Sequence, residues 1–81
     1  MKRTSPSSPT DLTLAHALRH LRLARGDTQE ELASKAGITV AALARIERCQ
    51  ANPRWTTVKR IIGALEISLA ELALEIEHAA V

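Results

Sequence analysis

The spacing of apolar residues predicts that helices make up most of the chain. Leu14, Leu18 and Leu21 recur every three or four positions, which places them on one face of a helix. Thr10 is the candidate N-cap of this first helix, and Gly26 is expected to end it in the left-handed conformation. No strand is visible in the pattern.

A second helix is predicted from the segment "TQEE". Thr28 and Glu31 have the spacing of a capping box, and the helix they open is expected to run through Ala36. Gly37 then supplies the positive φ of a tight turn into the next helix. Ala33 is small, which suits a position where the backbones of two sharply crossing helices approach.

Three further helices follow from start and stop signals. Thr39 is the predicted N-cap of a helix that runs to about Arg48. Asn52 and Pro53 interrupt the pattern before a fourth helix, roughly Trp55–Leu65, and Ser68 is expected to cap a fifth. The predicted fold is all-α, a compact bundle of five helices.

Composition supports one small helical domain. The 81 residues are 46% hydrophobic, and Trp55 is the only aromatic residue. Residues 1–9 are rich in Ser and Pro and are predicted to be a disordered arm, with the folded domain over residues 10–81. No apolar run is long enough to span a membrane, and no apolar core follows the basic start, so neither a membrane span nor a signal peptide is predicted. The lone Cys49 suits a reducing compartment, so a cytoplasmic protein is predicted.

Charge is distributed unevenly along the chain. Residues 1–60 hold all 11 Lys and Arg beside five acids, a net +6, whereas residues 61–81 hold four acids and no Lys or Arg. The basic segment, residues 1–60, favours contact with a polyanion on one face of the protein. The acidic terminal helix favours contact with a different kind of partner on another face. Two solvated surfaces would explain the charge counts equally well.

No arrangement of residues predicts catalysis. The chain has no Gly-rich phosphate loop and no Ser/His/Asp signature, so no enzyme and no cofactor are expected. His16 and His20 are one helical turn apart and could hold zinc, but a site needs further ligands. Cys49 would have to converge with them. A solvent-facing pair of histidines is therefore expected, and no metal.

A stretch of 55 residues resembles a known family. Residues 18–72, "LRHLRLARGDTQEELASKAGITVAALARIERCQANPRWTTVKRIIGALEISLAEL", are similar to the Cro/C1-type (XRE-family) helix-turn-helix domain. The markers are R-G-x-T-Q-E-E-L-A, A-G-I-T, I-E-R and N-P at regular offsets. The resemblance implies a lambda-repressor-like DNA-binding domain, whose third helix enters the major groove, acting as a homodimer on a palindromic operator.

The resemblance also implies roles for single residues. Gln29 matches a glutamine that donates to a phosphate and braces the third helix. Arg22 and Glu47 match an ion pair that ties the first helix to the end of the third, which a planar guanidinium can do with two parallel bonds. The implied DNA-binding set comprises Thr28, Gln29, Thr39, Val40, Ala41, Arg45, Arg48, Asn52 and Arg54.

The third helix would read DNA with few hydrogen bonds. By the resemblance Val40, Ala41 and Arg45 face the bases, whereas Leu43 and Ile46 belong to the core. Arg45 can contact guanine, the two small apolar residues can contact thymine methyl groups, and Thr39 can donate to a phosphate or a base. An Ala-rich helix that packs on protein is the alternative, because alanine has the highest helix propensity.

Two positions depart from the family pattern. Cys49 stands where the family usually has glycine after the third helix. A left-handed conformation there would cost a residue with a Cβ roughly 1 kcal/mol, so the turn is expected to differ. Asp27 replaces the usual apolar residue before the second helix, which removes a hydrophobic staple and adds a charge near the helix start.

The fifth helix is the predicted dimer interface. Its apolar surface is wider than a small domain's own core requires. Leu69, Leu72, Ala73, Ile76 and Ala80 form one stripe that the bundle could bury, and Ala70, Leu74 and Val81 form an adjoining one. A symmetric contact is the commonest use of such a seam. The predicted interface comprises Leu69, Ala70, Ala73, Leu74 and Ile76.

Three functions are open at this point. The first, which we favour, is a DNA-binding transcription regulator, similar to small single-domain regulators such as restriction–modification controller proteins. The second is an antitoxin, whose helix-turn-helix domain also binds a toxin protein. The third is a protein-interaction module that does not bind DNA. The expected partners are double-stranded DNA and a second copy of the chain, with no membrane.

Overall fold

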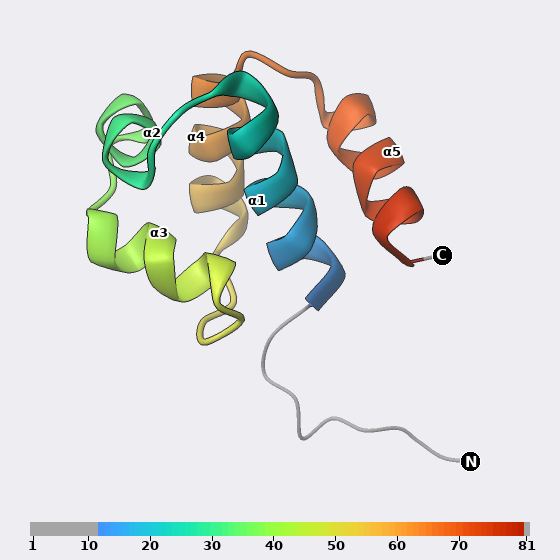
Figure 1. Cartoon of the computed structure of the whole chain (residues 1–81), viewed down its shortest axis with the longest axis horizontal. Coiled ribbons are helices and arrows are strands. Elements are labelled where there is room, and N and C mark those ends of the chain that lie inside the picture. The colour runs from blue at the N-terminus through green and yellow to red at the C-terminus, as the bar shows by residue number, and fades with distance from the viewer. Residues whose placement is uncertain (1–11, 81) are drawn as a thin grey trace.

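The computed structural model describes residues 12–80 as five α-helices, with no strand in that range (Figure 1). The all-α, five-helix prediction is confirmed. The predicted arm and the cap at Thr10 lie outside the described residues. The helices are α1 (Leu12–Arg25), α2 (Gln29–Ala36), α3 (Val40–Glu47), α4 (Trp55–Leu65) and α5 (Leu69–Ala80).

Three predicted N-caps are present and fix where helices begin. The Thr28 hydroxyl accepts from the Glu31 N–H at 3.0 Å, and the Glu31 carboxylate accepts from the Thr28 N–H at 2.8 Å. Ser68 and Glu71 form the same reciprocal box before α5, at 3.0 and 2.8 Å. The Thr39 hydroxyl accepts from a backbone N–H in the first turn of α3. Each cap satisfies donors that the helix itself leaves unpaired.

The turn from α2 to α3 depends on Gly37. Its φ of 73° and ψ of 32° are left-handed, and its N–H donates to the Ser34 carbonyl at 3.2 Å. The Ile38 N–H reaches back to the Ala33 carbonyl at 3.0 Å, which completes the helix end. Ala33 is buried, as its small size predicted. Only glycine adopts this conformation without a steric cost, so the sharp crossing of α2 and α3 follows.

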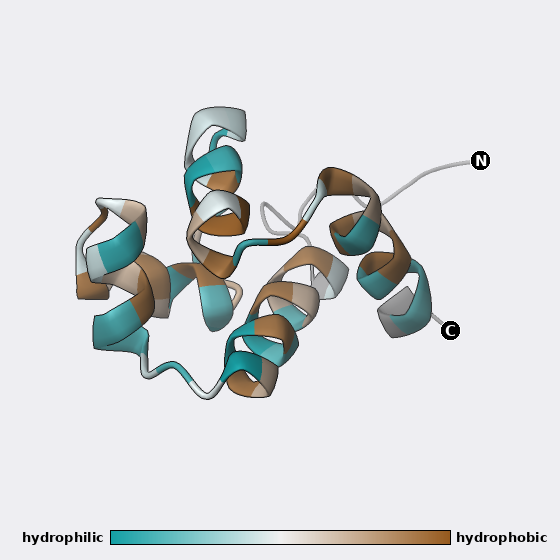
Figure 2. Ribbon diagram, turned by 90° about the horizontal axis from the view of Figure 1, so that it is seen from above, coloured by the Kyte–Doolittle hydropathy of each residue, from teal (hydrophilic) through white to brown (hydrophobic). Residues whose placement is uncertain are grey.

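The core draws on every helix. Leu18 of α1, Leu32 of α2, Leu43 of α3, and Ile61 and Leu65 of α4 have no exposed surface. Ile46 of α3 and Leu72 of α5 are also buried, so the predicted inward positions of α3 are confirmed. Figure 2 shows that each helix carries both hydrophobic and hydrophilic residues. Burying each large side chain contributes roughly 1.5–3 kcal/mol.

Cys49 adopts the conformation that the sequence argued against. Its φ is 62°, so the expectation that this turn would differ from a left-handed one was wrong. Its N–H donates to the Ile46 carbonyl at 3.1 Å, and the Gln50 N–H donates to the Arg45 carbonyl at 2.8 Å. These bonds close the end of α3 and offset the steric cost at Cys49.

Helix α5 rests mainly on α1. Leu72 is buried and Ile76 is half-buried against the core, but Leu69 and Ala73 are exposed. The prediction that Leu69 and Ala73 lie on the buried stripe was wrong, because a single neighbouring helix covers only a narrow strip. His20 is exposed, as predicted, yet it also bonds the Glu75 carboxylate at 2.6 Å and so ties α1 to α5. No helix within residues 12–80 has the length and apolar character to cross a bilayer.

Glu66 ends α4 in the left-handed conformation, with φ 60°. We expect Glu66→Gly to be about 0.5–1 kcal/mol more stable than Glu66→Ala, because glycine avoids the Cβ clash but loses more entropy on folding. Both variants lose the exposed 3.3 Å contact with Arg25, so their difference isolates the backbone. Urea denaturation measures it, and equal stabilities would show that this cap is unstrained.

Candidate nucleic-acid interface

The predicted ion pair between Arg22 and Glu47 is present and buried. The Arg22 Nε and Nη2 atoms donate to the two carboxylate oxygens of Glu47 at 2.7 and 2.8 Å. The two residues are 7% and 5% exposed, so water competes little for these bonds. The bidentate geometry fixes the last residue of α3 against α1.

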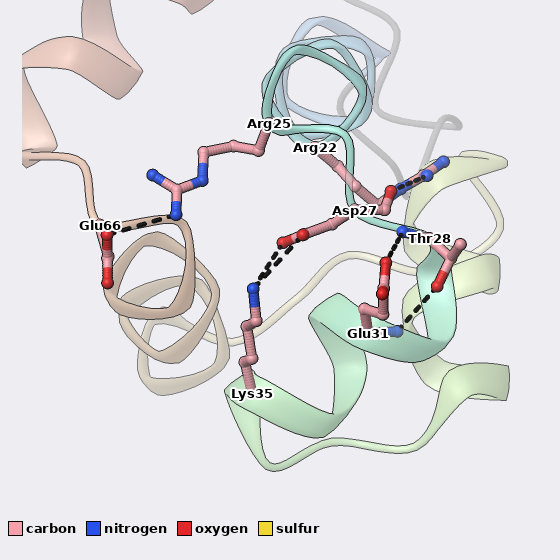
Figure 3. A network of polar contacts seen from close by, with 7 residues as sticks. All are labelled: Arg22, Arg25, Asp27, Thr28, Glu31, Lys35 and Glu66. Atoms are coloured by element: carbon pink, nitrogen blue, oxygen red, sulfur yellow. Dashed lines mark hydrogen bonds and ion pairs between the residues drawn. The ribbon is translucent and has the colours of Figure 1, made fainter.

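Two further bonds extend this pair into a network. The Gln29 side-chain amide donates to Glu47 Oε1 at 3.0 Å, so the start of α2 also holds the end of α3. Arg22 Nη1 donates to the Asp27 carbonyl at 2.9 Å, which fixes the turn between α1 and α2 (Figure 3). The bracing role that the resemblance implied for Gln29 is therefore visible in the structure.

The hydrogen bond to Glu47 raises the pKa of the Arg22 guanidinium above its ordinary value, and outweighs burial, which lowers it. The charges of Glu47, Asp27 and Glu30 act in the same direction. Because the pKa is raised on folding, its contribution to stability is present at neutral pH and is lost as the pH rises through the raised value.

Asp27 also has a partner that the sequence did not indicate. Lys35 Nζ lies 3.2 and 3.3 Å from its two carboxylate oxygens (Figure 3). The Asp27 side chain is only 12% exposed. An ion pair across α2 therefore stands where the family usually has an apolar contact.

One face of α3 points away from the protein. Thr39, Val40, Ala41, Arg45 and Arg48 are exposed, whereas Leu43, Ile46 and Glu47 are buried on the other side. The split follows the helical period, because residues three or four apart share a face. The structure thus places the predicted base-facing positions together at the surface. Of Val40, Ala41 and Arg45, only Arg45 has a side chain that can donate hydrogen bonds.

The basic residues around α3 have no acidic partners. Within residues 12–80, Arg45, Arg48 and Arg54 form no ion pair, whereas Arg22, Arg25 and Lys35 each have one. Arg45 belongs to α3, and Arg48 and Arg54 lie in the segment that joins α3 to α4. Figure 1 shows that this segment directly follows α3. This part of the surface therefore has positive charge available for an anion.

Helix α4 begins without a side-chain cap. Its N-cap is Arg54, which makes no capping bond, and its first turn holds no acidic residue. The positive end of the helix dipole and a cation therefore lie together, an arrangement that an external anion would stabilise. Lys59 is a second basic side chain in this helix, with its Nζ 5.8 Å from the centre of the Trp55 ring. The sequence signal for this uncapped start is an arginine at position 54, where Ser, Thr, Asp or Asn would supply a cap.

The remaining predicted contacts occupy the ends of these helices. Thr28 is exposed and Gln29 half-exposed at the start of α2, and Asn52 is exposed in the loop before α4. His16 and His20 are exposed on α1. Among residues 12–80, no three His, Cys, Asp or Glu side chains lie close enough together to hold a metal ion.

The crossing of α2 and α3, the outward face of α3 and the buried network behind it define a helix-turn-helix fold of the DNA-binding type. Comparison with known proteins agrees with this class. The chain belongs to the Cro/C1-type helix-turn-helix family, since the family model described as "Helix-turn-helix" matches residues 18–72. The family is one of DNA-binding regulators.

Two curated relatives show how the family domain is used elsewhere. Antitoxin HipB of Escherichia coli strain K12 is 40% identical over 62 residues, which are 76% of this chain and 68% of the relative. The immunity repressor protein of Bacillus phage phi105 is 34% identical over 64 residues, 79% of this chain but only 44% of the relative.

Two solved structures share most of this fold. The restriction–modification controller protein C.AhdI from Aeromonas hydrophila is 33% identical with a TM-score of 0.72, covering 75% of this chain and 92% of its own. C.Esp1396I bound to a 25 base pair operator site is 25% identical with a TM-score of 0.80, covering 85% of this chain and 91% of its own.

Arg22→Ala is expected to destabilise the protein by about 3–5 kcal/mol, because it leaves the Glu47 carboxylate buried without its main partner. The control is Arg25→Ala, which removes an exposed ion pair and should cost less than about 1 kcal/mol. Arg22→Met combined with Glu47→Leu should cost less than Arg22→Ala alone, because no charge is left stranded. Urea denaturation tests the order, and an unchanged stability in Arg22→Ala would contradict it.

Proposed function

We propose that this protein is a transcription regulator that binds specific DNA sequences with α3 in the major groove. The observation that carries the proposal is the outward face of α3, bordered by guanidinium groups that have no partner among the described residues. An α-helix fits the major groove, and phosphates supply the missing negative charge. Family membership and the operator-bound structure of C.Esp1396I support it.

Base recognition would rest on few side chains. Arg45 can donate two hydrogen bonds to a guanine, worth about 1–3 kcal/mol of discrimination. Val40 and Ala41 offer apolar contact to thymine methyl groups. The Thr39 hydroxyl accepts from a backbone N–H of α3, which leaves its own hydrogen for a phosphate or a base edge.

Contacts to the DNA backbone would come from both sides of α3. Thr28 and Gln29 lie at the start of α2, and Arg48, Asn52 and Arg54 lie between α3 and α4. The uncapped start of α4 would add its backbone N–H groups as donors to phosphate. Such contacts set the position of the protein on the duplex, and α3 then reads sequence.

Arg45→Ala is expected to lose about 1–3 kcal/mol of discrimination at one base pair of each half-site, because only this residue can make the bidentate contact. Arg54→Ala should instead weaken all sequences alike and lower the salt slope by about one unit. The control is Arg25→Ala, whose guanidinium is paired with Glu66. Binding of a random-sequence DNA pool, followed by titrations at several salt concentrations, separates these effects.

An Arg45→Ala variant with the sequence preference of the wild type would contradict the assignment of the reading residue. Gel shifts of the wild type on the DNA upstream of its gene, at two salt concentrations, test the broader proposal. No binding at either salt concentration would favour the alternative of a protein-interaction module.

The dimeric state is part of this proposal. Leu69 and Leu74 are 51% and 58% exposed, and Ala70 and Ala73 beside them are exposed as well. Ile76 contributes less, because it packs partly against its own core. These residues form an apolar face on α5 that a second copy can cover symmetrically. A dimer would place two α3 helices about 34 Å apart, which corresponds to one turn of DNA and to a palindromic site.

Leu74→Glu is expected to convert the dimer to a monomer at micromolar concentration and to weaken operator binding, because it places a charge in the apolar contact. Trp55→Glu introduces the same charge at a residue of similar exposure, 54%, on α4, and should leave the mass unchanged. Sedimentation equilibrium gives the masses. A monomeric wild type, with Leu74→Glu changing neither mass nor DNA affinity, would contradict the dimer.

A second candidate function is an antitoxin, favoured by the 40% identity to HipB. In that case the same domain would bind DNA and also a toxin protein. Co-purification with a second small protein encoded beside its gene would support the antitoxin. Purification of the chain alone, with full operator binding, would support the simple regulator.

A further inference from the structure

A surface cavity of about 240 Å³ lies beside the candidate DNA-binding face. This open cavity is lined by the turn before α3, one side of α3, the loop after it and the first turn of α4. Its lining includes three apolar residues, Ile38, Ile46 and Pro53, and two arginines, Arg45 and Arg54. The cavity therefore combines an apolar surface with positive charge.

The two arginines have no competing partner there. No acidic residue lines the cavity, and neither Arg45 nor Arg54 forms an ion pair within residues 12–80. The planar fork of a guanidinium matches a carboxylate through two parallel hydrogen bonds. Ile46 is 4% exposed and belongs to the core, so the apolar wall is held rigidly behind them.

We propose that this cavity binds a small organic carboxylate with a compact apolar body. The carboxylate would bond Arg45 and Arg54, and the body would contact Ile38, Ile46 and Pro53. The volume is below the roughly 300–1,000 Å³ of sites for drug-sized molecules, which limits the ligand to about the size of an aromatic monocarboxylic acid.

A DNA phosphate uses only half of this surface. It accepts hydrogen bonds from the guanidinium groups but has no apolar part to place against Ile38 and Ile46. A carboxylic acid with an apolar body satisfies both halves at once, since the apolar walls are removed from water and the charges are paired. The chemistry of the lining therefore favours the organic acid.

Binding of this acid has a consequence for DNA recognition. Arg45 and Arg54 are also the proposed contacts to a base and a phosphate, so the acid and DNA compete for the same two side chains. The acid would lower the affinity for DNA, and DNA would lower the affinity for the acid by the same factor. This consequence rests on the proposed function, whereas the binding of the acid does not.

Benzoate is the probe, titrated into the labelled full-length protein while NMR follows the Ile38 and Ile46 methyl groups. We expect saturable shifts with a Kd on the order of 1 mM, in keeping with a ligand of this size. Acetate and inorganic phosphate lack the apolar body, and benzyl alcohol lacks the charge. Each should bind at least about tenfold more weakly.

Two neighbouring threonines provide a matched pair of variants. Thr57 lines the cavity, whereas Thr56 is exposed and does not. Thr57→Phe should fill the cavity and abolish benzoate binding, and Thr56→Phe should bind as the wild type does. Thermal melts check that both are folded. Arg54→Gln provides a second test that leaves the cavity open and should weaken benzoate binding about tenfold.

Several results would overturn the cavity proposal. They are shifts that do not saturate, acetate or inorganic phosphate binding as tightly as benzoate, and unchanged binding in folded Thr57→Phe or in Arg54→Gln. At about ten times its Kd, benzoate should weaken binding to the upstream DNA about tenfold. Unaltered DNA affinity at that concentration would overturn the competition.

The two proposals fail separately. Saturable benzoate binding by a protein that binds no DNA would support the cavity and contradict the regulator. DNA binding without benzoate binding would do the reverse.

Discussion

The carboxylate of Glu47 is the contact on which the orientation of α3 depends. Helix α3 has only eight residues, too few to be stable alone, so its neighbours must hold it. Leu43 and Ile46 anchor it by burial, but apolar contacts alone permit some rotation about the helix axis. Two hydrogen bonds from the Arg22 guanidinium and one from the Gln29 side-chain amide converge on Glu47 and fix that rotation. The same bonds thereby fix which side chains face outward.

The charges of this domain divide into two groups with different roles. Arg22, Arg25 and Lys35 connect separate segments of the chain, and each lies against a carboxylate. Figure 3 shows two of these contacts, Arg25 with Glu66 and Lys35 with Asp27. Arg45, Arg48 and Arg54 belong to the other group, which has no acidic partner in residues 12–80. An anion that binds this positive surface displaces water from the arginines but does not have to break an ion pair within the protein. DNA and a small carboxylate both fit that description, which is why the two proposals meet at Arg45 and Arg54.

Helix α5 differs from the others in how it is attached. It packs on α1 through a narrow apolar strip and the bond between His20 and Glu75. A helix with one neighbour buries about one face, so Leu69 and Leu74 stay exposed. The proposed dimer would use that surface, and the DNA-binding face on α3 would not be obstructed by it.

The sequence by itself determined the local features of this protein. The capping boxes at Thr28 and Ser68 and the left-handed Gly37 depend on residues a few positions apart, so their chemistry can be read directly from the chain. The helices follow from the 3.6-residue period, whereas the inward side of α3 was expected from the family resemblance. The Arg22–Glu47 pair, whose residues are 25 positions apart, was expected only because of a family resemblance.

Only the tertiary structure decided what depends on neighbours from elsewhere in the chain. The bond between His20 and Glu75 joins residues 55 positions apart, which no local pattern connects. The exposure of Leu69 depends on how many helices surround α5, and the cavity beside Arg45 depends on how α3, α4 and the connections before and after α3 meet. At Cys49 and Glu66 the connection between helices imposed a left-handed backbone against the preference of the residue. Local preferences there amount to only about 1 kcal/mol, and packing of the whole core outweighs them.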